Sequence, residues 1–188
     1  GQHIRRVGEE IQSGKILIND GSSITTAELG TLATFGYKDV RVYRKPRLAI
    51  FATGDELVEP GNDLLPGQIY NSNLYVFEDL VMRAGAEVTL KSVIRDDQAS
   101  LKTFLTDAFY SCDMVISSGG VSMGRFDYVR DVLMELNVME HFWRVAQKPG
   151  KPLFFGSRGK SLIFGLPGNP VSAFIGFMEY VWPVLEIM

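Results

Sequence analysis

The chain has 188 residues, of which 46% are hydrophobic and 22% are charged, so it can bury a core and is not intrinsically disordered. A net charge of −3 argues against a nucleic-acid partner, and neither a membrane span nor a signal peptide is apparent. The single cysteine, Cys112, cannot form an internal disulfide, which favours a reducing compartment such as the cytoplasm. The start at Gly1 rather than Met indicates a piece of a longer chain.

The first 45 residues differ from the rest in their sequence pattern and are too few to build a core. Thr25 and Glu28 form a capping box that predicts a helix, and Gly36 is its expected end. A short strand is expected around residues 40–43. We therefore predict a short α+β lead-in segment that packs on other parts of the molecule.

From residue 47 onward, apolar runs alternate with helical periods. Strands are expected at residues 48–52, 88–94 and 114–116, and helices over the apolar stripes that begin at Leu74, Leu101 and Val129. Residues 153–155 and 162–164 flank a turn and predict a hairpin, and a last helix is expected from Pro170. The alternation favours a mostly parallel sheet covered on both faces, in which ligands bind beyond the carboxyl ends of the strands.

Three glycine-bearing loops follow predicted strands, at residues 53–56, 117–124 and 165–170. Loops of this kind expose backbone N–H groups, which suit an anion such as phosphate. Turn chemistry explains each loop taken singly; Asn169, for example, can cap the last helix with Pro170 at its first position. Together, at one edge of a sheet, the three loops favour an anion site.

Acidic residues accompany these loops at Asp55, Glu56, Asp96, Asp97 and Asp127. Carboxylates repel a phosphate unless a divalent cation, most often Mg²⁺, lies between them. Several of these acids also precede expected helices and can act as N-caps, a role that is compatible with metal binding.

A basic loop at residues 148–152 holds Lys148 and Lys151 between prolines, with Arg144 four residues before it. Such charges suit an oxyanion, and a solvated basic loop is the alternative. Residues 120–124 match the hydrolase elbow literally, but Ser122 comes too late after the strand for that role.

Taken in order, these motifs resemble the MoeA family of molybdopterin molybdenumtransferases, whose eukaryotic counterpart is the gephyrin E domain. The resemblance covers nearly the whole chain. It is carried by TGDEL at residues 53–57, PGQI at 66–69 with NSN at 71–73, SSGGVSMG at 117–124 with DY at 127–128, KPGKP at 148–152 and GLPGNPVS at 165–172.

The resemblance implies that residues 1–45 are the end of a neighbouring linker domain. Residues 46–188 would form a three-layer α/β/α sandwich of the MoaB/MogA type that binds molybdopterin. The implied activity is Mg²⁺-dependent insertion of molybdate into adenylylated molybdopterin, with release of AMP. The family further implies a cytoplasmic homodimer that contacts a molybdopterin adenylyltransferase, and a fragment that is inactive alone.

The family pattern also assigns residues. Glu56, Asp96 and Asp127 fall on functional acids and are the implied catalytic and metal-binding residues. Arg144 falls where the family has lysine, which keeps the charge but changes its geometry. The other implied substrate-binding residues are Thr53, Gly54, Asp55, Ser72, Asn73, Ser118, Gly119, Gly120, Ser122, Gly124, Lys148, Gly150, Lys151, Pro167, Gly168, Asn169, Pro170 and Ser172.

Three other functions remain open from the residues. They are a molybdopterin adenylyltransferase of the same fold, a non-catalytic gephyrin-like scaffold that binds peptides, and a CinA-like protein. The basic loop together with residues 165–170 favours the molybdenumtransferase. Molybdate and tungstate are both tetrahedral and of similar size, so the motifs suit either oxyanion.

Overall fold

A computed structural model describes residues 1–95, 97–120 and 128–188 of the chain. They form two compact units, Gly1–Arg44 and Lys45–Met188, here called unit 1 and unit 2. Unit 1 contains one helix, α1 (Thr26–Thr34), which begins at the predicted capping box and ends before Gly36. Leu32 is the single buried side chain of unit 1, so this unit has no hydrophobic core of its own.

The strand predicted around residues 40–43 is wrong. This stretch forms no strand, and Val40, Val42 and Tyr43 are exposed. A strand needs a second strand as the partner of its backbone N–H and C=O groups, and unit 1, all of whose residues are described, contains none. The assignment of residues 1–45 to the end of a neighbouring domain stays a prediction.

Unit 2 is built on a six-stranded sheet with the order β4-β1-β5-β8-β7-β6. Its strands are β1 (Arg47–Thr53), β4 (Glu87–Ile94), β5 (Met114–Ser118), β6 (Met139–Trp143), β7 (Phe154–Arg158) and β8 (Ser161–Leu166). The first four strands in the sheet order are parallel, as predicted. β7 is antiparallel to both β8 and β6, so β6 runs in the same direction as β8. A separate parallel pair, β2 (Leu57–Val58) and β3 (Ile69–Tyr70), follows β1.

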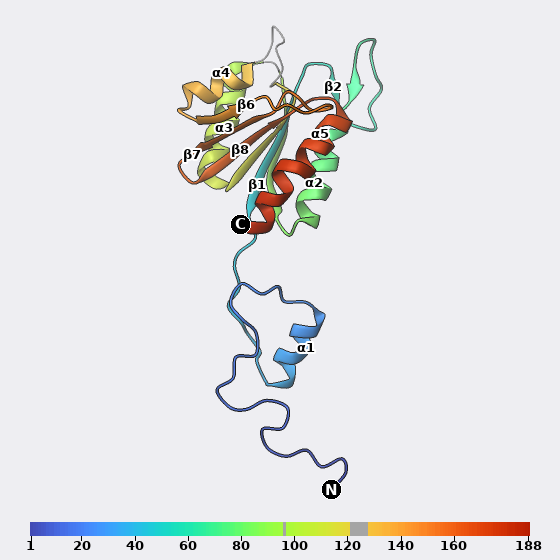
Figure 1. Ribbon diagram of the computed structural model, residues 1–188. Helices are drawn as coiled ribbons and strands as arrows, with labels where there is room; N and C mark the ends of the chain where they lie inside the picture. The colour runs from blue at the N-terminus through green and yellow to red at the C-terminus, as the bar shows by residue number, and fades with distance from the viewer. Residues whose placement is uncertain (96, 121–127) are drawn as a thin grey trace. The chain divides into compact units, whose positions relative to one another are not determined.

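Helices cover both faces of this sheet and give the expected three layers (Figure 1). One face carries α2 (Asn73–Arg83), α5 (Pro170–Gly176), the π-helix η1 (Phe177–Val181) and α6 (Trp182–Ile187); the other carries α3 (Gln98–Ser111) and α4 (Tyr128–Glu135). β1 serves both layers: Leu48 and Ile50 belong to one buried cluster, whereas Ala49 and Phe51 belong to the other. This alternation follows from the two-residue period of a strand.

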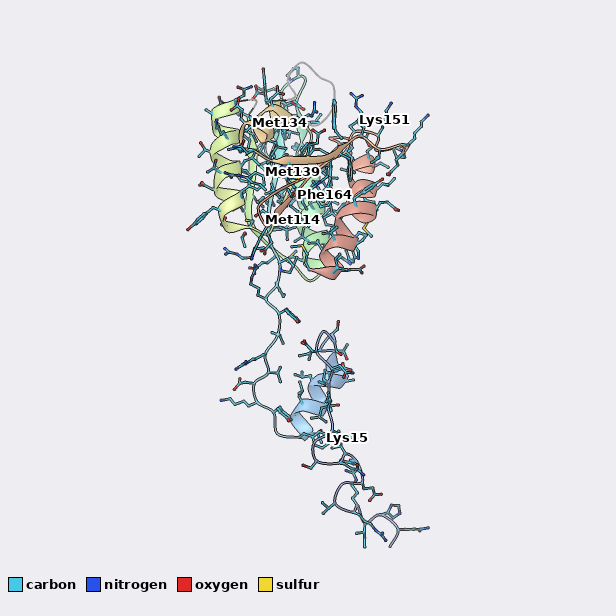
Figure 2. The ribbon with its side chains drawn as sticks, turned by 60° about the vertical axis from the view of Figure 1, so that its left-hand side comes forward. Lys15, Met114, Met134, Met139, Lys151 and Phe164 are labelled. Carbon is cyan, nitrogen blue, oxygen red and sulfur yellow. The ribbon has the colours of Figure 1, made fainter. Side chains whose placement is uncertain are left out.

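The local signals in unit 2 are confirmed where the structure describes them. β7 and β8 form the predicted hairpin, and Met114 of β5 and Phe164 of β8 are buried in the cluster under α2 and α5 (Figure 2). No helix among the described residues is long and apolar enough to cross a membrane.

Candidate functional site

The carboxyl ends of four strands lie level at one edge of the sheet, which we call the site edge. One row of paired residues crosses the whole sheet in the order Ser92, Phe51, Ser117, Gly165, Phe154 and Trp143. In the next row Ala52 pairs with Ser118, and Ser118 pairs with Leu166. Because β6 runs parallel to β8, Arg144 leaves the sheet at this same edge. The structure therefore brings Arg144 and the described parts of the predicted glycine loops to one side of unit 2.

The glycine loop after β5 runs close against the end of β1. A Cβ atom added to Gly119 would lie 3.5 Å from the carbonyl oxygen of Thr53. A Cβ atom on Gly120 would lie 2.2 Å from Cγ2 of Val129 and 3.0 Å from Oγ1 of Thr53. Both glycines have positive φ, +85° and +71°, which other residues rarely adopt. Only glycine fits this path, so the backbone here stays free of side chains.

The side chain of Asn73 joins this loop to the loop after β8. Its Nδ2 donates to Oγ of Ser118 at 2.7 Å and to the carbonyl oxygen of Gly168 at 2.8 Å. The N–H of Gly119 also donates to the carbonyl oxygen of Leu166 at 2.9 Å. Asn73 and Ser118 are buried, whereas Gly168 is exposed. Three segments that are distant in sequence are thus held together by short hydrogen bonds.

The other residues of the NSN motif differ from Asn73. Ser72 is exposed, and its hydroxyl makes no capping hydrogen bond to α2. Asn71 is 1% exposed, and its Nδ2 donates to Oε1 of Glu59 at 2.9 Å. Glu59 also accepts from the hydroxyl of Tyr75 at 2.7 Å. Within this motif, Asn73 therefore bonds to the glycine loops and Asn71 bonds to the segment after β2.

A cavity of about 620 Å³ opens at the ends of β1 and β4, and it is lined by Gly54, Asp55, Leu57, Gln68, Val93, Arg95 and Asp97. Gly54 has φ +145°, and a Cβ atom there would lie 2.6 Å from a carboxylate oxygen of Glu56. Sequence reasoning selected Gly54 and Asp55 but missed Arg95 and Gln68. The available signal for Arg95 was its place directly after the predicted strand at residues 88–94.

Asp97 has a structural role at this cavity. It caps α3, and its Oδ2 accepts from the N–H of Ser100 at 2.8 Å. The hydroxyl of Ser100, followed by that backbone N–H, holds the pKa of Asp97 below its ordinary value. The capping role expected for an acid at this position is therefore confirmed for Asp97.

The predicted acidic residues are described only in part. Asp96, Asp127, Ser122 and Gly124 lie outside the described residues. Asp55 and Glu56 are exposed at the site edge. Within residues 1–95, 97–120 and 128–188, no cluster of three His, Cys, Asp or Glu side chains could hold a metal ion. Glu56 offers the carboxylate oxygens that Mg²⁺ prefers, so a Mg²⁺ site at Glu56, Asp96 and Asp127 stays a prediction.

Arg144, four residues before the basic loop, stacks on an aromatic ring. Its guanidinium carbon lies 4.1 Å from the ring centroid of Trp143, and that of Arg130 lies 4.3 Å from the same centroid. Arg144 has φ +75°, and its N–H donates to the carbonyl oxygen of Leu153 at 2.7 Å. A lysine ammonium can also lie over a ring, as Lys91 does 4.1 Å from the ring centroid of Tyr75, but only a planar guanidinium can stack on the ring as well.

The rest of the basic loop lies against the start of α5. Lys148 and Lys151 are exposed, the latter at the rim of unit 2 (Figure 2). Gly150 is buried, and a Cβ atom on it would lie 3.7 Å from the carbonyl oxygen of Ser172. The structure thus brings the basic loop beside the predicted residues of the last motif.

That last motif begins α5 as predicted. Oδ1 of Asn169 accepts from the N–H and the hydroxyl of Ser172, at 3.2 and 3.3 Å, and Pro170 occupies the first turn. Pro167 is buried, while Gly168, Asn169 and Pro170 are exposed. The exposed backbone of this loop borders the junction held by Asn73.

A mostly parallel α/β sheet whose glycine loops meet beyond the carboxyl ends of its strands has the layout of the α/β domains that bind ligands at that edge. The family described as a probable molybdopterin binding domain matches residues 49–187. The chain belongs to this family.

Two curated relatives are named molybdopterin molybdenumtransferase. The protein from Haemophilus influenzae is 38% identical over 98% of this chain and 45% of its own length. The protein from Nostoc sp. is 39% identical over 99% of this chain and 43% of its own length. A solved molybdopterin biosynthesis MoeA protein from Pyrococcus horikoshii is 35% identical, with a TM-score of 0.83 over 96% of this chain and 44% of that chain. The chain therefore spans less than half the length of these relatives.

Proposed function

We propose that the chain supplies part of a molybdopterin molybdenumtransferase, the part that binds the pyrophosphate of adenylylated molybdopterin while molybdate is inserted and AMP is released. The observation that carries this proposal is the junction at the site edge, where Asn73 joins Ser118 to the Gly168 loop. The names of two relatives that match 98% and 99% of the chain support it. Since those relatives are more than twice as long, we propose that this chain binds ligand without completing turnover by itself.

The proposed chemistry needs donors for phosphate and molybdate oxygens. Glycine backbone and the Thr53 and Ser118 hydroxyls would provide neutral donors, and Arg144, Lys148 and Lys151 would provide positive charge. Glu56, Asp96 and Asp127 would hold Mg²⁺, which when bound polarises the phosphoanhydride that breaks. Ser72, exposed beside the junction, would add a further hydroxyl.

Calorimetric titration of the chain with AMP, with and without Mg²⁺, tests the nucleotide part of this proposal. We expect binding that Mg²⁺ strengthens, and loss of the Mg²⁺-dependent part in Asp96→Asn and Asp127→Asn. Asp113→Asn is the matched control, because Asp113 lies at the opposite edge of the sheet beside Arg47. The proposal is wrong if AMP does not bind, and the acid assignment is wrong if all three variants behave alike.

A second assay separates the two transferases of this fold. Adenylylated molybdopterin and molybdate are added, and AMP release is measured; ATP and molybdopterin are added in a parallel sample. ATP-dependent formation of adenylylated molybdopterin would favour the adenylyltransferase, which the names of the relatives do not favour. Turnover by this chain alone would contradict the proposal that it only binds.

The proposal extends to the setting of the protein. We propose that it acts in the cytoplasm as a homodimer and receives its substrate from a molybdopterin adenylyltransferase. The one cysteine, Cys112, is buried and free, which fits a reducing compartment. Sedimentation velocity and a pull-down with a purified adenylyltransferase test the two contacts.

A further inference from the structure

Asn73 has a hydrogen-bonding pattern that limits what it can do for a ligand. A carbonyl oxygen only accepts hydrogen bonds, so the atom facing the carbonyl of Gly168 at 2.8 Å must be the amide nitrogen. That nitrogen has two hydrogens, and the second points to Oγ of Ser118 at 2.7 Å. Both donors of the side chain are therefore used within the protein. Only Oδ1 is left, and an acceptor oxygen repels an oxyanion.

The same pattern leaves the hydroxyl proton of Ser118 unused by Asn73. Because Oγ of Ser118 accepts from Asn73, the hydroxyl proton of Ser118 stays available to donate elsewhere. Ser118 is the last residue of β5, next to the two glycines with positive φ. Ser118 is 4% exposed, so this hydroxyl would donate only to a ligand oxygen that lies directly against the end of β5.

We propose that Asn73 is a positioning residue: it orients the Ser118 hydroxyl and fixes the spacing of the two glycine loops, so that they can receive a phosphate oxygen of the substrate. This inference rests on the function proposed above. Under this proposal Asn73, which was predicted to contact the substrate, does not touch it and instead supports Ser118, which does.

Asn71 provides a matched control two residues away in the same motif. It is also buried, 1% exposed against 8% for Asn73, and its amide also donates to one side chain, Glu59. Its partner lies after β2 rather than in a glycine loop. Asn71→Ala therefore removes a comparable buried amide, together with the long contact between its Oδ1 and the N–H of Leu74 at 3.5 Å, and leaves both hydrogen bonds of the junction in place.

The first measurement is amide hydrogen exchange of the free protein, which needs no ligand. In Asn73→Ala we expect exchange in peptides covering residues 117–120 and 166–169 to rise by about tenfold, because the loops lose their link. Asn71→Ala should leave these peptides unchanged. Asn73→Asp is a second variant of the same size, and a carboxylate in the first turn of a helix suits the helix dipole, so this variant should stay folded. Unchanged exchange in both Asn73 variants would overturn the proposal.

The second measurement is AMP affinity in the presence of Mg²⁺. Asn73→Ala and Ser118→Ala should each weaken binding by about tenfold, and the double variant should lose clearly less than the product of the two losses, because the two residues share the Ser118 hydroxyl. Asn71→Ala should stay within about twofold of the wild type. Equal losses for Asn71→Ala and Asn73→Ala would show a merely structural role. If the wild type does not bind AMP, the proposed function fails, and the exchange result still decides whether Asn73 holds the junction.

Discussion

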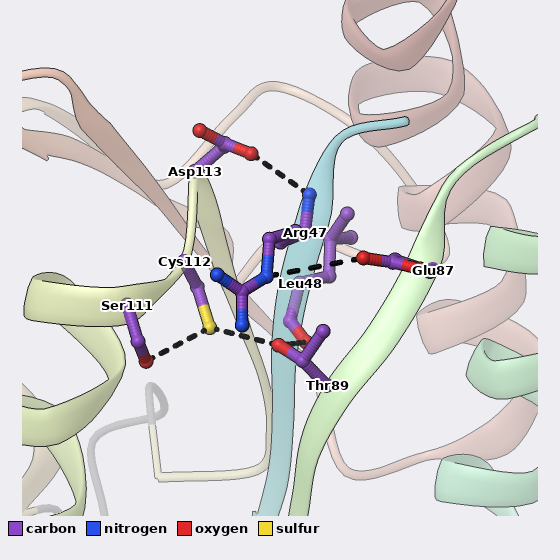
Figure 3. A network of polar contacts seen from close by, with 7 residues as sticks. All are labelled: Arg47, Leu48, Glu87, Thr89, Ser111, Cys112 and Asp113. Atoms are coloured by element: carbon purple, nitrogen blue, oxygen red, sulfur yellow. Dashed lines mark hydrogen bonds and ion pairs between the residues drawn. The ribbon is translucent and has the colours of Figure 1, made fainter. Parts of the chain in front are cut away.

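The two edges of the central sheet of unit 2 use polar groups in different ways. At the edge where β1, β4 and β5 begin, charged side chains make the links: the backbone N–H of Arg47 donates to the carboxylate Oδ2 of Asp113 at 2.8 Å, and Nε of Arg47 lies 3.8 Å from Oε1 of Glu87. Cys112 Sγ lies 3.2 Å from the hydroxyl of Thr89 in the same network (Figure 3). At the site edge, neutral groups make the links, through Asn73.

The difference is one of accessibility to a ligand: polar groups at the first edge are used within the protein, whereas the second edge exposes glycine backbone. At the first edge the carboxylate of Asp113 and the thiol of Cys112 are used in contacts within the protein, and such hydrogen bonds each add modestly to the stability of the fold. Neutral hydrogen bonds and glycines with positive φ keep the second edge ordered, and at Gly119 and Gly120 they leave the backbone without side chains. In a parallel α/β sheet the second edge is also where ligands bind. Three substitutions test this contrast, in order of decreasing effect.

Gly120→Ala should have the largest effect. The added Cβ would meet Val129 at 2.2 Å with φ at +71°, so we expect a loss of about 2–4 kcal/mol in the free energy of unfolding. Gly159→Ala is the control, because φ there is +60° with nothing within 4 Å, and about 1 kcal/mol is expected. Urea unfolding measures both, and equal losses would mean that the loop is not tightly packed.

Asp113→Ala should have a smaller effect, and on stability alone. It removes the acceptor for the Arg47 N–H, so we expect a loss of about 1 kcal/mol in the free energy of unfolding. AMP affinity should not change, because the site lies at the other edge. Asp107→Ala, at an exposed position on α3, is the control. Weaker AMP binding in Asp113→Ala would break the proposed division between the edges.

Glu59→Gln should have the smallest effect, visible only as a change in pH dependence. The Tyr75 hydroxyl, followed by the Asn71 amide, holds the pKa of Glu59 below its ordinary value. A lowered folded-state pKa gives stability that is present above the unfolded pKa and lost as the pH falls through the folded pKa. The difference between Glu59→Gln and wild type should therefore shrink from about pH 5 downward. Tyr75→Phe should reduce the same pH-dependent part, and a constant difference across this range would contradict the assignment.

Local sequence signals predicted the frame of unit 2 because they act over short distances. The capping role of Asn169, the helix start at Pro170 and the two-residue period of β1 each depend on neighbours in the chain. β6 was not predicted, since its alternation of exposed and half-buried residues at the end of the sheet is weak. The prediction of a strand at residues 40–43 is wrong because these residues have no second strand to pair with in unit 1.

The division of roles within the NSN motif could not be predicted from sequence. Asn71 and Asn73 are the same residue type two positions apart, yet Asn71 finds a partner 12 residues away and Asn73 finds partners 45 and 95 residues away. Such pairings depend on the completed sheet. The predicted residues Thr53, Ser118, Gly119, Gly120 and Gly168 do meet, whereas the positions of the acids Asp96 and Asp127 stay outside the described residues.

The length and register of β1 are constrained both by the hydrophobic core and by the site edge. Its side chains alternate between two hydrophobic clusters, and its end is in register with Ser118 and Val93. One residue inserted within β1 would exchange the clusters that its side chains enter and would also move Thr53 out of line with the glycine loop. Insertions are therefore tolerated in the connecting loops rather than in the strand. The same frame of strands can in this way carry loops of different length and chemistry.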